Sequence, residues 1–242
     1  MNNLKTILIS GGTKGIGKSF VLKLLQDGFN VATFSRDVAK VKILNEELSS
    51  LYDIDRFIVL RGDVTNENEV KKVVGDVIAK FKTINILINN AGIGYFRDAD
   101  KFDINRFNTM INTNIVGVAL LTKYVVPQMK LNKTGLIINI ASISGKVAFA
   151  NGEFYSATKF AVMGYSQAIR AELKEFGIKV STICPGMIKT EFFDDEELER
   201  RKKVWNGVVP QMLEVDDVAN IVSLVCKQSD HCDVQDVTLM PF

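Results

Sequence analysis

Residues 5–10 read KTILIS, and residues 11–17 follow at once as GGTKGIG, just ahead of the helical pattern FVLKLL. The first run is apolar and β-branched, which favours a buried strand. Strand, glycine turn and helix in this order form the phosphate-binding start of a nucleotide-binding βαβ unit. The glycines let the backbone approach a pyrophosphate, and the start of the helix offers unpaired N–H groups. This stretch therefore predicts an α/β fold with a dinucleotide site.

A second nucleotide site competes for the same residues. Residues 12–19, GTKGIGKS, match the P-loop pattern G-x-x-x-x-G-K-[ST], in which Lys18 and Ser19 would hold phosphate and magnesium. A P-loop enzyme also needs an acidic metal partner after another strand, and only Asp63 could serve. Since such a mechanism has no use for Tyr155 and Lys159, the dinucleotide site is the favoured interpretation.

Tyr155 and Lys159 form a Y-x-x-x-K pair inside an amphipathic segment over residues 153–176. Residues four apart share one helix face, so the phenol and the ammonium can point into the same space. A nearby cation stabilises the phenolate and lowers the tyrosine pKa from its ordinary value near ~10. Such a phenol can act as a general acid or base at neutral pH, although the same spacing is also common in solvated surface pairs.

Hydrophobic patterning along the chain alternates between strands and helices. Several expected strands, such as ILIS and GLIINI, are apolar on both faces, which is typical of a parallel sheet covered by helices. The pattern predicts a doubly wound, Rossmann-type α/β fold with a parallel sheet and ligand bound beyond the carboxyl ends of the strands. The expected strands cover residues 5–10, 30–35, 56–61, 84–89, 135–140, 179–184 and 236–240, and the expected helices cover residues 16–26, 38–51, 67–81, 112–130, 153–176 and 215–227.

Length and composition agree with one enzyme-sized domain over residues 1–242, with a formal net charge of +2. So small a charge argues against a nucleic-acid or membrane partner, and no apolar run approaches the ~20 residues that span a bilayer. Cys184, Cys226 and Cys232 show no C-x-x-C spacing, and the lone His231 has no partner at ligand spacing. We therefore expect reduced thiols, no metal site and a cytoplasmic protein.

Six motifs in order make the chain resemble the short-chain dehydrogenase/reductase family over nearly its whole length. The turn at residues 10–17 resembles the family's T-G-x-x-x-G-x-G, with Ser10 in place of threonine. Ser142 stands 13 residues before Tyr155, as the family's catalytic serine does. The remaining motifs are Asp63-Val64 as the adenine-contacting pair, Asn89-Asn90-Ala91-Gly92 after the fourth strand, Asn114 as the helix asparagine, and Pro185-Gly186 followed by Thr190.

The resemblance implies the roles of the catalytic residues. Tyr155 would be the acid/base, and Lys159 would lower its pKa and hold the nicotinamide ribose. Ser142 would hydrogen-bond the carbonyl oxygen of the substrate, with Ser144 as a competitor in register, while Asn114 would position a water that links Lys159 to solvent. The cofactor carries the hydride, so the protein must orient it and move one proton.

The cofactor choice is predicted from charge at the end of the second strand. An acidic residue there accepts hydrogen bonds from the adenosine ribose of NAD, whereas an arginine accommodates the 2′-phosphate of NADP. Here Ser35-Arg36 occupies this place, Lys14 adds a cation in the glycine turn, and Asp37 would restore an acidic partner if the register shifted by one. We therefore predict NADP(H). The expected cofactor-binding residues are Gly11, Thr13, Lys14, Gly15, Ile16, Gly17, Ser35, Arg36, Asp63, Val64, Asn90, Ala91, Gly92, Tyr155, Lys159, Pro185, Gly186, Ile188 and Thr190.

The substrate site is expected to be apolar, which suits a ketone or aldehyde with a hydrophobic part. A charge-dense stretch, EFFDDEELERRKK at residues 191–203, lies within a segment of about 187–212 that is either a solvated helix or, by the resemblance, a substrate lid carrying Phe192, Phe193 and Trp205. The expected substrate residues are Ser142, Ile143, Tyr155, Phe96, Phe149, Met187 and Phe192, with Ile93, Tyr95 and Phe154 as further pocket candidates.

Three alternatives to a general carbonyl or hydroxy-acid oxidoreductase stay open. A 3-oxoacyl-acyl carrier protein reductase usually ends in a glycine-rich tail, whereas this chain ends VTLMPF at residues 237–242. A pterin reductase, like a general carbonyl or hydroxy-acid oxidoreductase, fits that ending at least as well as an acyl carrier protein reductase does. A non-catalytic NADP(H)-binding redox sensor would not need Ser142, Tyr155 and Lys159 together. The resemblance also implies a homodimer or homotetramer formed through the two long helices over residues 112–130 and 153–176.

Overall fold

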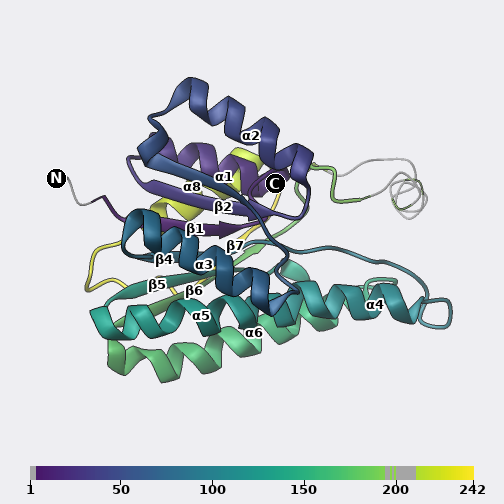
Figure 1. Cartoon of the computed structure of the whole chain (residues 1–242). Helices are drawn as coiled ribbons and strands as arrows, with labels where there is room; N and C mark the ends of the chain where they lie inside the picture. The colour runs from purple at the N-terminus through teal and green to yellow at the C-terminus, as the bar shows by residue number, and fades with distance from the viewer. Residues whose placement is uncertain (1–3, 194–196, 198, 200–210) are drawn as a thin grey trace.

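The computed structural model describes residues 4–193, 197, 199 and 211–242. Its sheet has seven parallel strands in the order β3-β2-β1-β4-β5-β6-β7 (Figure 1). The order reverses between β1 and β4, which opens a crevice for a ligand at the carboxyl ends of these two strands. The strands are β1 Thr6–Ser10, β2 Asn30–Ser35, β3 Phe57–Arg61, β4 Ile86–Asn89, β5 Gly135–Ile140, β6 Ile178–Pro185 and β7 Asp236–Leu239.

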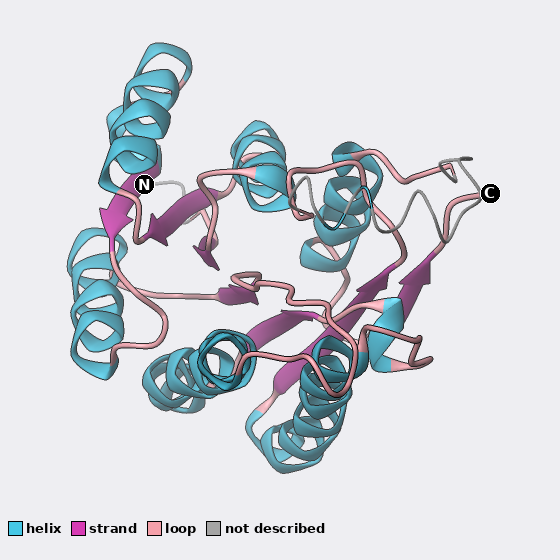
Figure 2. Ribbon diagram, turned by 90° about the vertical axis from the view of Figure 1, so that its right-hand side faces the viewer, coloured by secondary structure: helices cyan, strands magenta, loops and turns pink. Residues whose placement is uncertain are grey.

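Two layers of helices cover the sheet, one on each face (Figures 1 and 2). The first layer is α1 Gly15–Gln26, α2 Val38–Leu51 and α8 Val215–Cys226, and the second is α3 Glu67–Phe81, α5 Gly117–Asn132 and α6 Glu153–Leu173. Each layer buries its own apolar cluster against the sheet, with Phe20 and Val222 in the first and Val74 and Val125 in the second. Because both faces are covered, the central strands β1 and β4 are buried throughout, and the predicted doubly wound fold is confirmed.

The expected helix over residues 112–130 is longer in the structure. It starts eight residues earlier, as α4 Ile104–Ile111, and reaches α5 through a π-helical turn, Asn112–Val116. Asp103 caps α4 by accepting hydrogen bonds from the backbone N–H groups of Asn105 and Arg106. The prediction missed α4, although Ile104, Phe107 and Ile111 recur at helical spacing and are a usable signal. In Figure 1, α4 projects past the sheet on the side where the strands end.

The continuous helix Ile104–Asn132 is long and apolar enough, by length and composition, to cross a membrane, with a mean hydropathy of 1.2 over its most apolar window. It is the one such helix among the residues that the structure describes. Its buried side chains, among them Leu121, Val125 and Met129, pack against the sheet in the second apolar cluster. Such packing is typical of a core helix.

Candidate functional site

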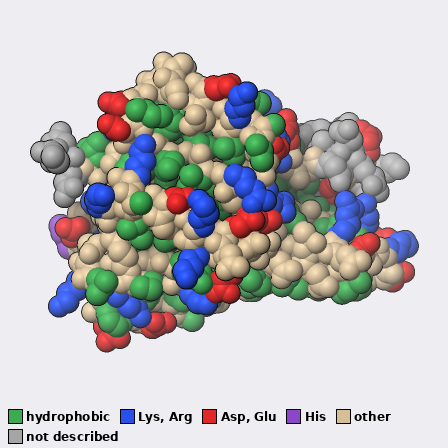
Figure 3. All heavy atoms as spheres, in the orientation of Figure 1, with side chains coloured by type: hydrophobic (Ala, Val, Ile, Leu, Met, Phe, Trp, Pro, Cys, Tyr) green, Lys and Arg blue, Asp and Glu red, His purple; other side chains and the backbone are tan. Residues whose placement is uncertain are grey.

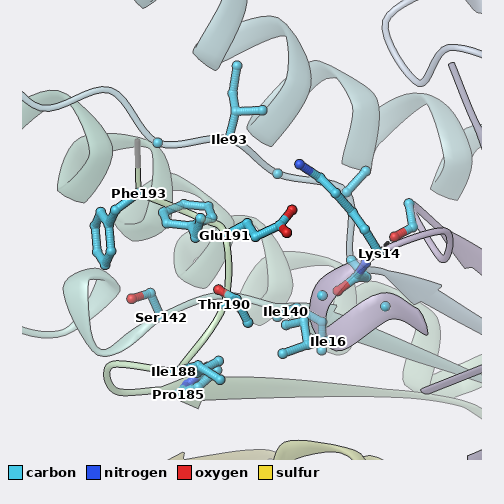
Figure 4. Close-up of a pocket in the computed structure, with 18 of the residues that line it drawn as sticks. Lys14, Ile16, Ile93, Ile140, Ser142, Pro185, Ile188, Thr190, Glu191 and Phe193 are labelled. Atoms are coloured by element: carbon cyan, nitrogen blue, oxygen red, sulfur yellow. Dashed lines mark hydrogen bonds between the residues drawn. The ribbon is translucent and has the colours of Figure 1, made fainter. Parts of the chain in front are cut away.

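A cavity of about 1410 Å³ lies where the strands end. Its walls come from the glycine turn after β1, the end of β2, the segment after β4, the turn after β5, α6 and the segment after β6. In the close-up of Figure 4, Lys14 and Ile16 lie towards one end of this cavity, and Ser142 and Phe193 lie at the other. The cavity therefore has a glycine-turn end and an aromatic end.

The glycine turn brings the backbone close to the cavity, as a bound pyrophosphate requires. Gly11 and Gly15 have φ values of +70° and +53°, which favour glycine. A Cβ on Gly17 would stand 2.2 Å from the carbonyl oxygen of Gly11, so only glycine lets α1 start this close to the strand end. Asn90 holds the turn by donating from Nδ2 to the carbonyl oxygens of Ser10 and Gly11, at 2.9 and 3.1 Å.

A dinucleotide fits this end of the cavity. The buried Asn90 Oδ1 has no hydrogen-bond partner among the described residues, and Asn90 itself lines the cavity. Every residue of the turn that was predicted to bind cofactor lines the cavity, as do most of the other predicted cofactor residues. These are Gly11, Thr13, Lys14, Gly15, Ile16, Gly17, Ser35, Arg36, Val64, Asn90, Ala91, Gly92, Tyr155, Lys159, Pro185, Gly186, Ile188 and Thr190.

Asp63 is the exception among the predicted cofactor residues. Its neighbours Gly62 and Val64 line the cavity, whereas Asp63 itself does not. Its carboxylate accepts hydrogen bonds from the backbone N–H and the hydroxyl of Thr65, at 2.9 and 2.8 Å. These hydrogen bonds stabilise the turn after β3. The second oxygen of the Asp63 carboxylate lies 3.7 Å from the guanidinium of Arg36.

The P-loop alternative fails on the direction of Ser19. Its hydroxyl donates to Asp216 Oδ1 of α8 at 2.8 Å, and Ser19 is buried and does not line the cavity. Helix α1 already starts at Gly15, so Lys18 lies in its first turn, where its ammonium pairs with Glu47 of α2 at 2.6 Å. The lysine and serine of the P-loop pattern therefore have structural partners on α2 and α8.

Positive charge gathers where β2 ends. Lys14, Arg36 and Lys40 all line the cavity there. The carboxylate of Asp37 accepts a hydrogen bond from the backbone N–H of Lys40 at 3.1 Å, because it caps α2. The sequence analysis missed Lys40, although its position one helical turn beyond Arg36 is a usable signal. In Figure 4 the Lys14 side chain extends into the cavity towards Glu191 on the opposite wall.

Tyr155, Lys159 and Ser142 meet in the same cavity. The Lys159 ammonium lies 5.7 Å from the centre of the Tyr155 ring and donates to the carbonyl oxygen of Ile140 at 2.9 Å. Tyr155 is 9% exposed and Lys159 only 6%. This burial lowers the pKa of Lys159 from 10.5 to about 8, since a charged ammonium is costly where water is excluded. The pair is therefore a buried one, and the surface-pair alternative is wrong.

Ser142 lies two residues beyond the end of β5 and caps the short turn Ile143–Gly145. Its hydroxyl oxygen accepts a hydrogen bond from the backbone N–H of Ser144 at 3.1 Å. Ser144 also lines the cavity, so both serines stay near the predicted site. The cap gives Ser142 a fixed orientation at the cavity wall.

Asn114 lies behind the cavity wall, at the centre of the π-helical turn. Its carboxamide bonds both the N–H and the carbonyl oxygen of Ile93, each at 2.9 Å, and donates to the Thr158 hydroxyl at 3.0 Å. A Cβ on Gly92 would be 3.4 Å from Asn114 Oδ1 and 3.6 Å from Lys159 Nζ, so both side chains flank the same glycine. Asn114 thus joins the segment after β4 to α6.

The aromatic end of the cavity centres on Phe96. Its ring centre lies 5.3 Å from Tyr155, 5.4 Å from Phe193, 6.1 Å from Phe149 and 6.4 Å from Phe192. All seven predicted substrate residues line the cavity, as does Ile93. The other two further candidates, Tyr95 and Phe154, do not line this cavity.

Tyr95 and Phe154 are those two candidates. Tyr95 lines a separate small cavity, and Phe154 packs with Phe102 and Phe107 at ring distances of 4.4 and 4.7 Å. Successive residues of a loop point to different sides, which a run of aromatic letters does not reveal. Trp205 and most of the predicted lid lie outside the described residues. The base of that segment is closed by a β-bridge between Ile188 and Leu213.

No group of three histidine, cysteine, aspartate or glutamate side chains suited to a metal ion occurs among the residues that the structure describes. The cysteines Cys184, Cys226 and Cys232 are free thiols, the first two buried and the third exposed.

Comparisons with known proteins agree with this geometry. A serine 3-dehydrogenase of Rhizobium radiobacter is 30% identical over 240 residues, covering 98% of this chain and 93% of its own. A 3-oxoacyl-[acyl-carrier-protein] reductase of Staphylococcus aureus is 30% identical over 227 residues, covering 93% of this chain and 92% of its own. The solved closed form of a serine dehydrogenase complexed with NADP+ is 28% identical, with a TM-score of 0.88 over 98% of this chain and 94% of that one. A family model described as short chain dehydrogenase matches residues 5–201, and the chain therefore belongs to the short-chain dehydrogenase family.

Proposed function

We propose that this protein is an NADP(H)-dependent oxidoreductase that interconverts a carbonyl and a secondary alcohol, with Tyr155 as the acid/base. The observation that carries the proposal is the shared cavity of Ser142, Tyr155 and Lys159 with the glycine turn. The glycine turn would hold the nucleotide, and the aromatic end of the same cavity would have room for a small organic substrate.

The residues of the chain divide the work of proton transfer. Nicotinamide chemistry supplies the hydride when the cofactor is bound. The Tyr155 hydroxyl gives its proton to the substrate oxygen in reduction and takes it back in oxidation, while the hydroxyl of Ser142 orients that oxygen by a hydrogen bond. The buried ammonium of Lys159, 5.7 Å from the Tyr155 ring, favours the phenolate. Asn114 serves as the helix asparagine that links Lys159 towards solvent.

Preference for NADP(H) over NAD(H) rests on the three cations at the end of β2. A 2′-phosphate accepts charge-assisted hydrogen bonds, and Lys14, Arg36 and Lys40 surround the cavity at this end. Asp37 also lines the cavity, but one of its carboxylate oxygens caps α2 and the other lies 3.9 Å from the Lys40 ammonium. The residue at the end of β2 is Ser35 and not an acid. The NADP+ complex of the similar serine dehydrogenase supports the same choice.

The relatives do not select one substrate. A serine dehydrogenase and a 3-oxoacyl reductase are each 30% identical to this chain. Hydroxy acids, acyl thioesters and pterins therefore all remain candidate substrates. A redox sensor of this fold would need cofactor binding without turnover. The buried Tyr155–Lys159 pair beside Ser142 favours an enzyme.

A turnover assay tests the proposal directly. The purified protein is mixed with NADPH or NADH and a panel of aldehydes, ketones, acyl thioesters and pterins, and the loss of nicotinamide absorbance is followed. We expect reduction of at least one carbonyl, faster with NADPH. Tight NADPH binding with no turnover on any compound would instead support the redox sensor.

We further infer a homodimer or homotetramer in the cytoplasm, with residues 187–212 as the substrate lid. Val116 and Phe160, on the two long helices, are 38% and 46% exposed, and burial of such side chains in a symmetric interface would be favourable. Sedimentation at micromolar concentration tests the assembly, and a monomer would contradict it.

A further inference from the structure

A row of polar side chains crosses four neighbouring strands where the sheet meets α6. Its members are direct partners in the register of adjacent strands: Asn89 of β4, Asn139 of β5, Thr182 of β6 and Asp236 of β7. The first three are at most 2% exposed. A polar group that loses its hydrogen bond in so dry a place destabilises the protein. Bonds made by this row therefore fix the position of whatever element they reach.

Helix α6 meets the row with polar side chains of its own. Asn139 Nδ2 donates to the hydroxyl oxygen of Ser166 at 2.8 Å. The guanidinium of Arg170, one helical turn after Ser166, lies 3.5 Å from the Thr182 hydroxyl and 3.2 Å from the Asp236 carboxylate. Directional bonds thus join α6 to β5, β6 and β7, in addition to its apolar packing on the sheet.

The hydrogen bonds around Asn139 have one direction. The Ser166 hydroxyl donates to the carbonyl oxygen of Val162 in its own helix at 2.7 Å, so towards Asn139 it accepts. Asn139 therefore turns its Nδ2 to α6 and its Oδ1 to β4, where Asn89 Nδ2 donates to it at 2.8 Å. Asn139 and Ser166 are both 0% exposed. A shift of α6 along the sheet would leave the Asn139 amide unpaired and away from water.

The same face of α6 carries Lys159 to β5. Lys159 lies seven residues before Ser166, which is about two helical turns, or roughly 10 Å along the axis. Its ammonium donates to the carbonyl oxygen of Ile140 at 2.9 Å, and Ile140 directly follows Asn139 in β5. Two bonds from one face of α6 therefore end on consecutive residues of one strand. A displacement of α6 that breaks the first bond also moves the second.

We propose that the Asn139–Ser166 hydrogen bond sets the position of α6 along the sheet and thereby holds the Lys159 ammonium at the Ile140 carbonyl. Asn139 and Ser166 are thus positioning residues that act through Lys159. The inference rests on the proposed oxidoreductase function, in which Lys159 favours the Tyr155 phenolate. Apolar packing defines the position of α6 less sharply, because hydrophobic contact is non-directional.

Ser166→Ala tests the positioning role in the cofactor-free, full-length protein. Burial holds the pKa of Lys159 at about 8, below its ordinary 10.5, so the wild type gains stability as the pH rises between these values. If the variant releases Lys159 towards water, its pKa rises again and this gain is lost. Two titratable groups, Tyr155 on α6 and Cys184 on β6, interact with the Lys159 ammonium, and both remain in the variant.

Urea unfolding at pH 7 and pH 10 measures the effect. The variant should be less stable than the wild type at both, and its deficit should be larger at pH 10. A deficit of the same size at both pH values would mean that the bond only stabilises the fold, and would overturn the proposal. Ser166→Cys, whose thiol is a weaker acceptor, should change in the same direction as Ser166→Ala and by less.

Ser223→Ala is the matched control, because it also removes a buried hydroxyl that bonds a side chain of another element. Ser223 of α8 is 4% exposed and donates to Asp27 Oδ2, on the opposite face of the sheet from α6 and outside the main cavity. Its deficit in stability should be the same at pH 7 and pH 10. A deficit that grew with pH as much as that of Ser166→Ala would contradict the positioning role.

Turnover gives a second readout. The assay uses NADP+ and the alcohol formed from the panel compound that the wild type reduces. Ser166→Ala should raise by about one unit the pH at which the oxidation rate reaches half its maximum, because a displaced ammonium favours the phenolate less. Ser223→Ala should leave that pH unchanged. An unshifted profile in Ser166→Ala would overturn the positioning role and leave the oxidoreductase function standing. If the wild type reduced no compound, that function would fail, and the pH dependence of stability would still decide the positioning role.

Discussion

The two ends of the main cavity are built in different ways. At the glycine turn the walls are backbone and small residues, held by short hydrogen bonds such as those from Asn90 to Ser10 and Gly11. At the aromatic end the walls are large rings, and Phe96 touches four others there. A backbone cradle accepts one ligand shape, whereas rings on loops can repack around many. The contrast explains why the cofactor is easier to predict than the substrate.

Charge on the protein surface is less clearly divided than the two ends of the main cavity are. On the face shown in Figure 3, lysine and arginine side chains alternate with aspartate and glutamate, which agrees with the small net charge of +2. The cations that matter are local: Lys14, Arg36 and Lys40 lie at the glycine-turn end of the main cavity. The predictions below test whether the two ends act separately.

The largest effect is expected at the junction of the two ends. Tyr155→Phe keeps the ring and its packing on Phe96 but removes the group that transfers the proton. Turnover should fall by the ~10²–10⁴-fold typical of a general acid, while NADPH binding stays. Steady-state kinetics and NADPH fluorescence measure the two quantities. If the variant kept more than about a tenth of the wild-type rate at saturating NADPH, Tyr155 would not be the principal acid/base.

Gly17→Ala should damage the glycine-turn end first. The added Cβ would meet the Gly11 carbonyl oxygen at 2.2 Å and Asn90 Nδ2 at 2.5 Å, so the turn must shift at a cost of about 1–3 kcal/mol or more. Urea unfolding and NADPH titration should both show the loss.

Gly75→Ala is the control for that substitution. Gly75 lies inside α3, and a Cβ there meets nothing within 4 Å, so alanine should stabilise the helix by about 0.5–1 kcal/mol. If both variants were equally stable and bound NADPH alike, the close approach at Gly17 would not be a constraint.

Arg36→Ala should reduce the preference for NADPH over NADH and should leave substrate binding at the aromatic end unchanged. Loss of one charge-assisted bond of about 1.5–3 kcal/mol should weaken NADPH binding by about 10–100-fold, with NADH binding nearly unchanged. Fluorescence titration with both cofactors measures this.

Lys18→Ala serves as the matched cation, since its ammonium pairs with Glu47, and NADPH affinity should stay within about threefold. Equal weakening of both cofactors by Arg36→Ala, or a wild type that prefers NADH, would contradict the 2′-phosphate assignment.

Lys159→Met should alter how stability depends on pH in the cofactor-free protein. With a pKa of about 8 in the folded state and 10.5 in the unfolded chain, Lys159 loses its proton first when folded. The unfolded state then holds more protons between these values, so wild-type stability rises with pH relative to the variant, by about 1–3 kcal/mol in total. Urea unfolding at several pH values from 7 to beyond 10 measures the difference. A difference that is flat across this range contradicts the buried-ammonium interpretation.

Phe192→Ala should give the smallest change, confined to the aromatic end. Its ring lies 5.7 Å from Tyr155 and 6.4 Å from Phe96, and an aromatic pair contributes about 0.5–1.5 kcal/mol. We expect KM for the carbonyl substrate to rise by roughly 2–10-fold and the NADPH dissociation constant to stay the same. A larger effect on NADPH than on substrate would show that the two ends are coupled.

Much of the site follows from short patterns in the sequence. The order of strand, glycines and helix over residues 5–26 needs no distant contact to be recognised, and Tyr155 and Lys159 share a face through helical spacing alone. The cation at Arg36 follows directly from the end of β2. Each of these features depends on residues a few positions apart.

Other features could not be predicted because they depend on packing. Tyr95 and Phe96 are neighbours in a loop, yet Tyr95 lines the separate small cavity and Phe96 lines both cavities. Helix α4 carries apolar residues at helical spacing, but only Met110 is fully buried, and the helix continues into α5 through a π-helical turn. That extension brings Arg106 beside Tyr95. The sequence shows neither which side of the loop Tyr95 faces nor that α4 places Arg106 against it.

By itself, the sequence determined the strands, the helices other than α4, and where glycine permits a ligand to approach, because backbone conformation and helical or strand periodicity are local properties. Only the tertiary structure decided which side chains share a cavity. Ser142 and Tyr155 share the cavity and Asn114 lies behind its wall, because sheet order and helix packing bring their three segments together. Ser19 faces Asp216 of α8 for the same reason. Side chains from distant segments come together through many long-range contacts, and no single segment of the sequence contains the information for all of these contacts.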